Sequence, residues 1–174
     1  MKDKSNRIFN EDKIEKLFQK NKDLALEKLK DLAIYCDNSK DIIIPGLNGW
    51  LYEQTIQYCI RKELKNKGLK ATIVEQAKLD SRKNSRKKVD LQINDNIAIE
   101  VKYTGLFHPK DIDKYKENKK TSNKNKVTYL FLSGWEGSNN YRKRIKSSLG
   151  KNNAFYIDEE GEWNRFMNTI ESLL

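Results

Sequence analysis

Two carboxylates and one lysine are the side chains of this sequence best placed to do chemistry together: Asp90, Glu100 and Lys102. Nine residues separate Asp90 from Glu100, and a single valine separates Glu100 from Lys102. Carboxylate oxygens suit a hard divalent ion such as Mg²⁺, which binds one or two carboxylates together with substrate phosphate and water. An adjacent lysine can orient a water molecule or balance developing charge, and partial burial is expected to lower its pKa. The three residue types therefore indicate a magnesium-dependent site.

Residues 88–103, KVDLQINDNIAIEVKY, are predicted to form the β-hairpin that positions this group. Apolar residues alternate with others on both sides of Asn94-Asp95-Asn96, and a period of two is typical of strands. Asn and Asp tolerate the left-handed conformation of a tight turn. A two-residue loop would pair each apolar residue with a polar one, so the three-residue loop is favoured. It places six apolar side chains on one face: Val89, Leu91, Ile93, Ile97, Ile99 and Val101.

The favoured register sets Asp90 directly opposite Glu100, with Lys102 one step further on the same face. Opposed residues have Cβ atoms roughly 4.5–5.5 Å apart, and like charges in that position destabilise a sheet. A cation held between the two carboxylates explains the arrangement most simply. The alternative is a half-solvated hairpin whose outer face, which also carries Gln92 and Ala98, happens to be charged.

Asp90 followed at this spacing by Glu100-Val101-Lys102 on a hairpin resembles the motif of the PD-(D/E)XK nuclease superfamily, which has the restriction-endonuclease-like fold. Val89 stands where that motif has a proline. The resemblance implies Mg²⁺-dependent hydrolysis of phosphodiester bonds in DNA, with Mn²⁺ as a substitute ion. It also implies that Asp90, Glu100 and the backbone carbonyl of Val101 bind the metal, and that Lys102 acts on the attacking water or the transition state.

A restriction-type DNA endonuclease is the function expected from this resemblance. A homodimer is expected with it, because one site cuts one strand. Two alternatives stay open. One is a structure-selective nuclease of the Holliday-junction-resolvase kind, acting on branched rather than plain double-stranded DNA. The other is a non-catalytic DNA-binding subunit with a relict site.

Glu53 is a further candidate, on a helix predicted for residues 48–67. Spacings of three and four place it on one face with Trp50, Ile56, Ile60 and Leu64. In the superfamily a helix just before the sheet commonly carries a glutamate that points at the metal, which implies a supporting role for Glu53. The alternative is a first-turn glutamate favoured by the helix dipole.

The charge balance favours a polyanionic partner. The chain has 174 residues, of which 35 are basic and 25 acidic, and its net charge is +10. A basic protein of this kind commonly binds nucleic acid. Two clusters are expected to contact the DNA backbone, although the first is also consistent with a solvated loop. Their members are Arg82, Lys83, Arg86, Lys87 and Lys88 before the hairpin, and Arg142, Lys143 and Arg144 on a later helix.

Cysteine content and hydropathy exclude several other classes. Cys36 and Cys59 are the only cysteines, too few for a zinc finger or an iron–sulfur nuclease, and each is expected to pack as a small apolar residue. No apolar run approaches 18 residues, so a soluble protein of the cytoplasm, without membrane contact, is expected.

The expected fold class is α/β, with a central mixed sheet flanked by helices. Residues 1–45 are assigned to an N-terminal helical extension and residues 46–174 to the core. The extension is predicted to begin at the capping residue Asn10, to break at residues 19–23 and to have a frayed start. The remaining predicted elements are a strand at 70–79, a helix from Pro109 with a loop at 119–126, a strand at 127–132, a turn at 133–137, a basic helix ending at Gly150, a strand at 154–157 and a C-terminal helix from Trp163.

Overall fold

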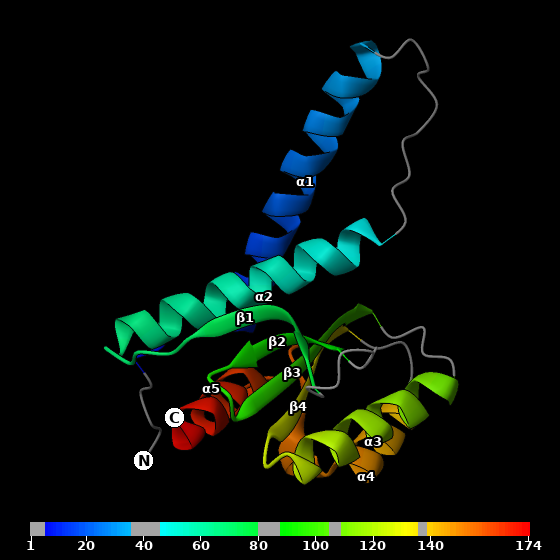
Figure 1. Cartoon of the computed structure of the whole chain (residues 1–174). Helices are drawn as coiled ribbons and strands as arrows, with labels where there is room; N and C mark the ends of the chain where they lie inside the picture. The colour runs from blue at the N-terminus through cyan, green and yellow to red at the C-terminus, as the bar shows by residue number, and fades with distance from the viewer. Residues whose placement is uncertain (1–5, 36–45, 80–87, 105–108, 136–138) are drawn as a thin grey trace.

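The computed structural model describes residues 6–35, 46–79, 88–104, 109–135 and 139–174, and it shows a five-stranded mixed sheet with helices on both faces (Figure 1). The predicted α/β class is therefore confirmed. The elements in chain order are α1 (Glu11–Tyr35), α2 (Leu47–Asn66), β1 (Ile73–Lys78), β2 (Lys88–Ile93), β3 (Ile97–Thr104), α3 (Pro109–Lys124), β4 (Thr128–Trp135), α4 (Asn139–Leu149), a short 3₁₀ turn (Lys151–Asn153), β5 (Ala154–Tyr156) and α5 (Glu162–Leu173).

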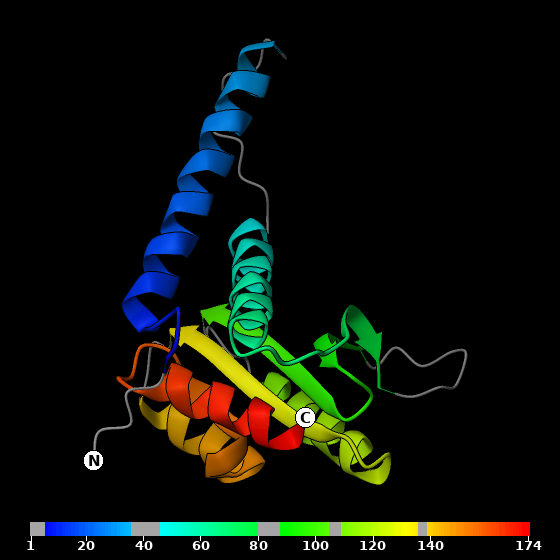
Figure 2. The same ribbon diagram turned by 90° about the vertical axis from the view of Figure 1, so that its left-hand side faces the viewer.

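The strands lie in the order β1-β2-β3-β4-β5. Neighbours are antiparallel from β1 to β3 and parallel from β3 to β5. The two parallel connections run through α3 and α4, as parallel strands require a crossover. These two helices cover one face of the sheet, whereas α1, α2 and α5 lie on the other (Figure 2).

Each face of the sheet has its own hydrophobic core. On one face, Ile56 and Ile60 of α2 and Trp163 of α5 are fully buried against Leu91 and Ile99 of the hairpin. The core on the other face joins α3 and α4 to the central strands through Ile112, Tyr115, Tyr129, Phe131, Ile145 and Leu149. Burial on both faces explains why β4 is apolar at successive positions.

The hairpin has the predicted turn and register. Leu91 pairs with Ile99 and Ile93 with Ile97, and Asn94 adopts a left-handed backbone with φ of 47°. Val89 was expected to share a face with the other apolar residues of the hairpin. This expectation was wrong, because its side chain lies in the core beneath α3 and α4. Gln76, beside this point on β1, has φ of 48°. We attribute the change of face to the local twist that this left-handed residue introduces.

The N-terminal region departs most from prediction. Asn10 does cap the helix, since its Oδ1 accepts the Lys13 N–H at 3.0 Å. However, α1 continues unbroken through residues 19–23, which are good helix formers apart from Asn and Asp. The chain before it is anchored rather than frayed from residue 6 onward, because Arg7 pairs with Glu171.

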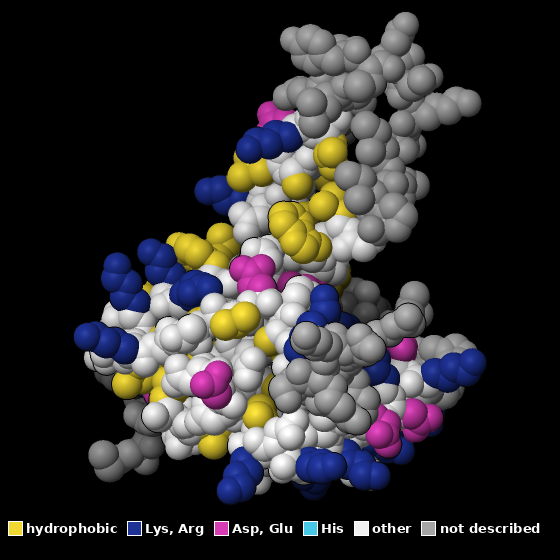
Figure 3. Space-filling view, in the orientation of Figure 1, with side chains coloured by type: hydrophobic (Ala, Val, Ile, Leu, Met, Phe, Trp, Pro, Cys, Tyr) yellow, Lys and Arg dark blue, Asp and Glu magenta, His cyan; other side chains and the backbone are white. Residues whose placement is uncertain are grey.

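The first half of α1 packs on α2 and the second half projects away from the sheet (Figures 1 and 2). Ile14 and Phe18 are fully buried in the core shared with α2, and Asn21 donates to Thr55 of α2 at 3.2 Å. Beyond this crossing, Leu24 and Leu26 are 45% and 38% exposed. Figure 3 shows the hydrophobic side chains on this part of α1.

Two elements, α3 and β4, end later in the chain than the sequence predicted. α3 extends to Lys124 through the stretch predicted as a loop, and its polar Asn118 and Ser122 are buried there. β4 extends to Trp135 through part of the predicted turn. The end of α2 before Gly68 was predicted correctly. Among the described residues, no helix combines the length and apolar character needed to cross a membrane.

Candidate active site

The hairpin brings the three motif side chains together. The Nζ atom of Lys102 lies 3.0 Å from Oε1 of Glu100 and 3.4 Å from Oδ2 of Asp90. The lysine side chain is 27% exposed, while the Asp90 and Glu100 side chains are 12% and 1% exposed. The predicted convergence is therefore observed, in a partly buried position where electrostatic interactions exceed their strength at the surface.

Asp90 is fixed by the backbone of the neighbouring strand. Its Oδ2 accepts the Val101 N–H at 2.7 Å, and its Oδ1 is 3.5 Å from Nε2 of Gln76. The expected direct pairing of Asp90 with Glu100 is not formed, because the ladder between β2 and β3 ends at Leu91 and Ile99. The aspartate side chain instead bonds the N–H of Val101, which holds its carboxylate beside that of Glu100.

Glu100 is a buried carboxylate that is only partly neutralised. Its Oε1 is close to two lysines, Lys102 and Lys114. Its Oε2 is buried and has no hydrogen-bond partner within the described part of the chain. A buried acceptor left without a partner costs roughly 1–3 kcal/mol, and a charged one costs more. A cation at this oxygen would remove that cost, so the residues present fit a divalent ion.

The carboxylates suit magnesium better than a metal with many protein ligands. The described residues contain no group of three or more His, Cys, Asp or Glu side chains arranged to hold a metal. Asp90 and Glu100 supply two carboxylates, and the proposed third protein ligand, the carbonyl of Val101, lies in β3 between Glu100 and Lys102. Magnesium usually takes one or two carboxylates and fills the rest of its shell with water and phosphate.

Lys102 does not have the lowered pKa that the sequence suggested. Burial alone would lower its pKa, but Glu100 and Asp90 together outweigh burial, and the lysine pKa is raised. The expectation fails because the lysine is surrounded by opposite charges at contact distance. In the metal-free protein Lys102 is therefore a hydrogen-bond donor and a positive charge.

Glu53 belongs to the same electrostatic cluster. Burial, Asp90 and Glu100 together raise the pKa of its carboxyl to about 7, against the opposing effect of Lys102. Three acidic groups thus influence one another beside Lys102. Of the residues predicted to share a helix face with Glu53, Ile56 and Ile60 are fully buried. Trp50 does not follow this prediction, because it is 56% exposed. Trp50 lies in the first turn of α2.

The basic residues divide into three groups. The first group lies outside the described residues and comprises Arg82, Lys83, Arg86 and Lys87. Two other residues, Cys36 and His108, also lie outside the described residues. Lys88, Lys143 and Arg144 are exposed, at the start of β2 and on α4. The guanidinium of Arg142 pairs with Asp158 and Glu159 and stacks on Tyr156 at 4.9 Å, so it already has acidic partners within the chain. The acidic residues that pair with this guanidinium follow β5 in the sequence. The spacing of residues along α4 therefore gives no sign of them.

Lys114 is the site residue that the sequence did not reveal. It comes from α3, and its Nζ lies 3.2 Å from Oε1 of Glu100. The buried phenols of Tyr115 and Tyr129 flank the same carboxylate; burial raises their pKa values, and Glu100 adds to the effect. No motif in the sequence points to Lys114, because its contact with Glu100 depends on the packing of α3 on the sheet.

Comparisons with models of protein families, with curated proteins and with solved structures find no match to this chain. The evidence for the site is thus the geometry of its own residues. That geometry combines two adjacent carboxylates, a buried carboxylate oxygen without a partner in the described chain, and two lysine ammonium groups.

Proposed function

We propose that this chain is a metal-dependent endonuclease that hydrolyses phosphodiester bonds in DNA. The observation that carries the proposal is the buried Glu100 carboxylate beside Asp90 and Lys102, with one oxygen left unpartnered among the described residues. The resemblance of Asp90 and Glu100-Val101-Lys102 to the PD-(D/E)XK motif supports the same conclusion.

Asp90, Glu100 and the Val101 carbonyl would hold Mg²⁺ or Mn²⁺. When bound, the ion lowers the pKa of water and stabilises negative charge on the phosphate. In the proposed reaction, in-line attack of a water molecule on phosphorus would form one P–O bond and break another, giving a phosphate monoester and an alcohol that takes up the proton of the water. Asp90 keeps its orientation through its bond to the Val101 N–H.

Lys102 acts as a donor in this proposal. In its protonated form it would orient the attacking water or stabilise the charge that develops on phosphate oxygens. Glu53 would act as a supporting ligand in its ionised form. Its carboxyl, with a pKa of about 7, loses its proton readily when a cation arrives.

DNA binding rests on the positive charge around the site. Lys88 at the start of β2, together with Lys143 and Arg144 on α4, is exposed and available to phosphates. Arg82, Lys83, Arg86 and Lys87 immediately precede β2 in the sequence and would add to the same surface. Contacts of this kind give affinity and register without reading base sequence.

A homodimer is part of the proposal, because one such site cuts one strand. Two sites are needed for a double-strand break in duplex DNA or for symmetrical cuts in a four-way junction. Exposed apolar side chains on α1 and at the start of α2, namely Leu24, Leu26 and Trp50, offer surface that a second copy would cover.

The test is a cleavage assay with supercoiled plasmid and a four-way junction in the presence of Mg²⁺. Wild type is expected to cut, whereas Asp90→Asn and Lys102→Ala are expected to bind DNA and to lose at least 100-fold in rate, as is common when a charge-stabilising group is removed. Cutting of the junction alone would select the structure-selective alternative. DNA retarded in a gel but left intact by wild type would select the binding-only alternative and reject the nuclease.

A further inference from the structure

The Glu100 carboxylate is shared by two lysines of different exposure. Lys102 and Lys114 lie 3.0 and 3.2 Å from the same oxygen, Oε1. The Lys102 side chain is 27% exposed, whereas that of Lys114 is 55% exposed. Lys102 also reaches Asp90 and lies within the site, so Lys114 is the outer of the two cations.

We propose that Lys114 is a phosphate-binding residue that rests on Glu100 in the metal-free protein and moves to a DNA phosphate when a divalent ion binds this carboxylate. The inference depends on the proposed nuclease function and assigns it a further substrate contact. A divalent ion at Glu100 would supply the positive charge that Lys114 now supplies. The flexible four-carbon stem of lysine lets the displaced ammonium reach a phosphate nearby.

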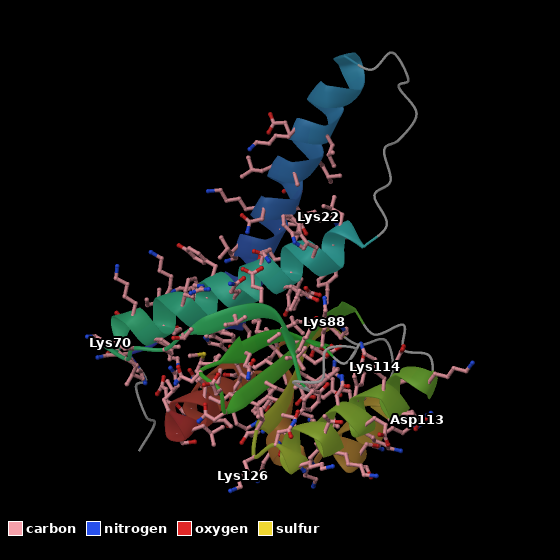
Figure 4. All side chains as sticks on the ribbon, viewed as in Figure 1. Lys22, Lys70, Lys88, Asp113, Lys114 and Lys126 are labelled. Atoms are coloured by element: carbon pink, nitrogen blue, oxygen red, sulfur yellow. The ribbon has the colours of Figure 1, made fainter. Side chains whose placement is uncertain are left out.

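The surroundings of Lys114 hold its stem next to the site. Its ammonium lies 5.7 Å from the ring centre of Tyr115, a residue buried against β4, so the side chain rests on the inner edge of α3. Figure 4 shows Lys114 on the side of α3 nearer the sheet and Asp113 turned away. A positive side chain so placed is well situated for the backbone of a substrate bound over the metal.

The same helix supplies a matched control. Lys116 has a side chain 51% exposed, close to the 55% of Lys114, but its ammonium lies 3.7 Å from Asp113 and not at the site. Replacing either lysine by methionine removes one charge from the same helix and keeps most of the apolar stem. A difference between the two variants therefore reports position, not net charge.

The experiment compares wild type, Lys114→Met, Lys114→Arg and Lys116→Met in the full chain. Duplex and junction DNA affinities are measured over a range of salt with Ca²⁺, and single-turnover cleavage is measured with Mg²⁺. For Lys114→Met we expect the slope of log affinity against log salt to fall by about 0.9, the value of one phosphate contact. Its cleavage rate is expected to fall about tenfold or more, with partial recovery in Lys114→Arg and less than a twofold change in Lys116→Met.

Equal salt slopes and equal cleavage rates for Lys114→Met and Lys116→Met would overturn the inference while leaving the nuclease in place. If Lys114 has a purely structural role, Lys114→Met will have a lower unfolding temperature but the same salt slope as wild type. That result would also overturn the inference. If wild type binds DNA and cuts none, the nuclease proposal fails, and the salt slope still decides whether Lys114 contacts phosphate.

Discussion

At the scale of single residues, the distinctive feature of the site is a buried carboxylate with one oxygen that lacks a partner among the described residues. Lys102 neutralises part of the charge on Asp90 and Glu100, but Glu100 keeps one oxygen with no partner in the described chain. Glu53 responds to the same negative charge through its raised pKa. Ligands that bind only the folded state stabilise it, so a bound divalent ion is expected to relieve this repulsion and to stabilise the fold.

Replacing Glu53 by glutamine should stabilise the metal-free protein at alkaline pH. The folded pKa of about 7 exceeds the ordinary value of 4.5, so the folded state holds its proton more tightly and stability falls as pH rises between these values. Glutamine cannot ionise. Urea unfolding at pH 8 in a chelator should show Glu53→Gln more stable than wild type by on the order of 2 kcal/mol, and the difference should shrink toward zero as pH approaches 4.5.

Glu75→Gln is the control for this measurement. Hydrogen bonds from Gln57 and Gln54 lower the pKa of the Glu75 carboxyl, so that variant should lose a little stability at pH 8 and not gain any. Destabilisation of Glu53→Gln by the same amount at both pH values would show that the pKa of the Glu53 carboxyl is not raised in the folded protein.

At the scale of elements, α2 and β4 set the position of Glu53. The glutamate follows Tyr52, whose ring is 1% exposed and packs against Gly134 of β4. A Cβ atom at Gly134 would lie 2.6 Å from both Cζ and Oη of Tyr52 and 3.1 Å from the Tyr103 carbonyl oxygen. The close approach of the helix to the sheet, and hence the depth of Glu53, depends on this glycine.

Gly134→Ala should therefore destabilise the protein by about 1–3 kcal/mol, the usual cost of overpacking a filled core. Gly49→Ala on α2 is the control, because no atom lies within 4 Å of its added Cβ and alanine favours a helix by up to about 1 kcal/mol. Chemical denaturation measures both changes. A Gly134→Ala protein as stable as wild type would mean that Tyr52 does not fill the space beside β4.

Local patterns were enough to predict the elements that carry the motif. Strict alternation and an Asn-Asp-Asn turn determined the register of Leu91 with Ile99. The change of face at Val89 arises from a backbone twist beside Gln76, a residue with no sequence pattern of its own.

The features that the sequence did not reveal depend on contacts between distant segments. Arg142 is neutralised by residues that follow β5, and Lys114 reaches Glu100 because α3 packs on β4, the strand next to that of Glu100. α3 was predicted too short because it buries the polar Asn118 and Ser122 where an apolar stripe was sought. Such contacts are set by tertiary packing, which a single sequence does not display.

At the scale of the whole molecule, positively charged side chains should contact DNA phosphates only where they lie near the site. The site is at the end of the hairpin away from its turn, near Lys88 and Lys114, whereas Lys70 and Lys126 lie at the other end of the sheet (Figure 4). With a net charge of +10, removing charge anywhere weakens a uniform attraction to DNA. Removing direct contacts to phosphates has a larger effect that depends on salt.

The variant Arg86→Glu with Lys87→Glu should therefore lower the salt slope of DNA binding by about 1.8, the value of two phosphate contacts. The variant Lys70→Glu with Lys126→Glu makes the same change in net charge at the far end and should leave the slope within about 0.5 of wild type. Fluorescence anisotropy at several salt concentrations measures both slopes. Equal losses in the two variants would show that net charge, not a defined surface, binds DNA.

The central claim is that Asp90 and Glu100 together bind a divalent ion. The most direct test is anomalous diffraction from crystals of the wild-type protein and of Asp90→Asn, each soaked with Mn²⁺. The account predicts in wild type a manganese peak roughly 2.1 Å from a carboxylate oxygen of each residue, and a weakened or absent peak in the variant. A wild-type crystal with no manganese between the two carboxylates, or with manganese bound only elsewhere, would contradict it.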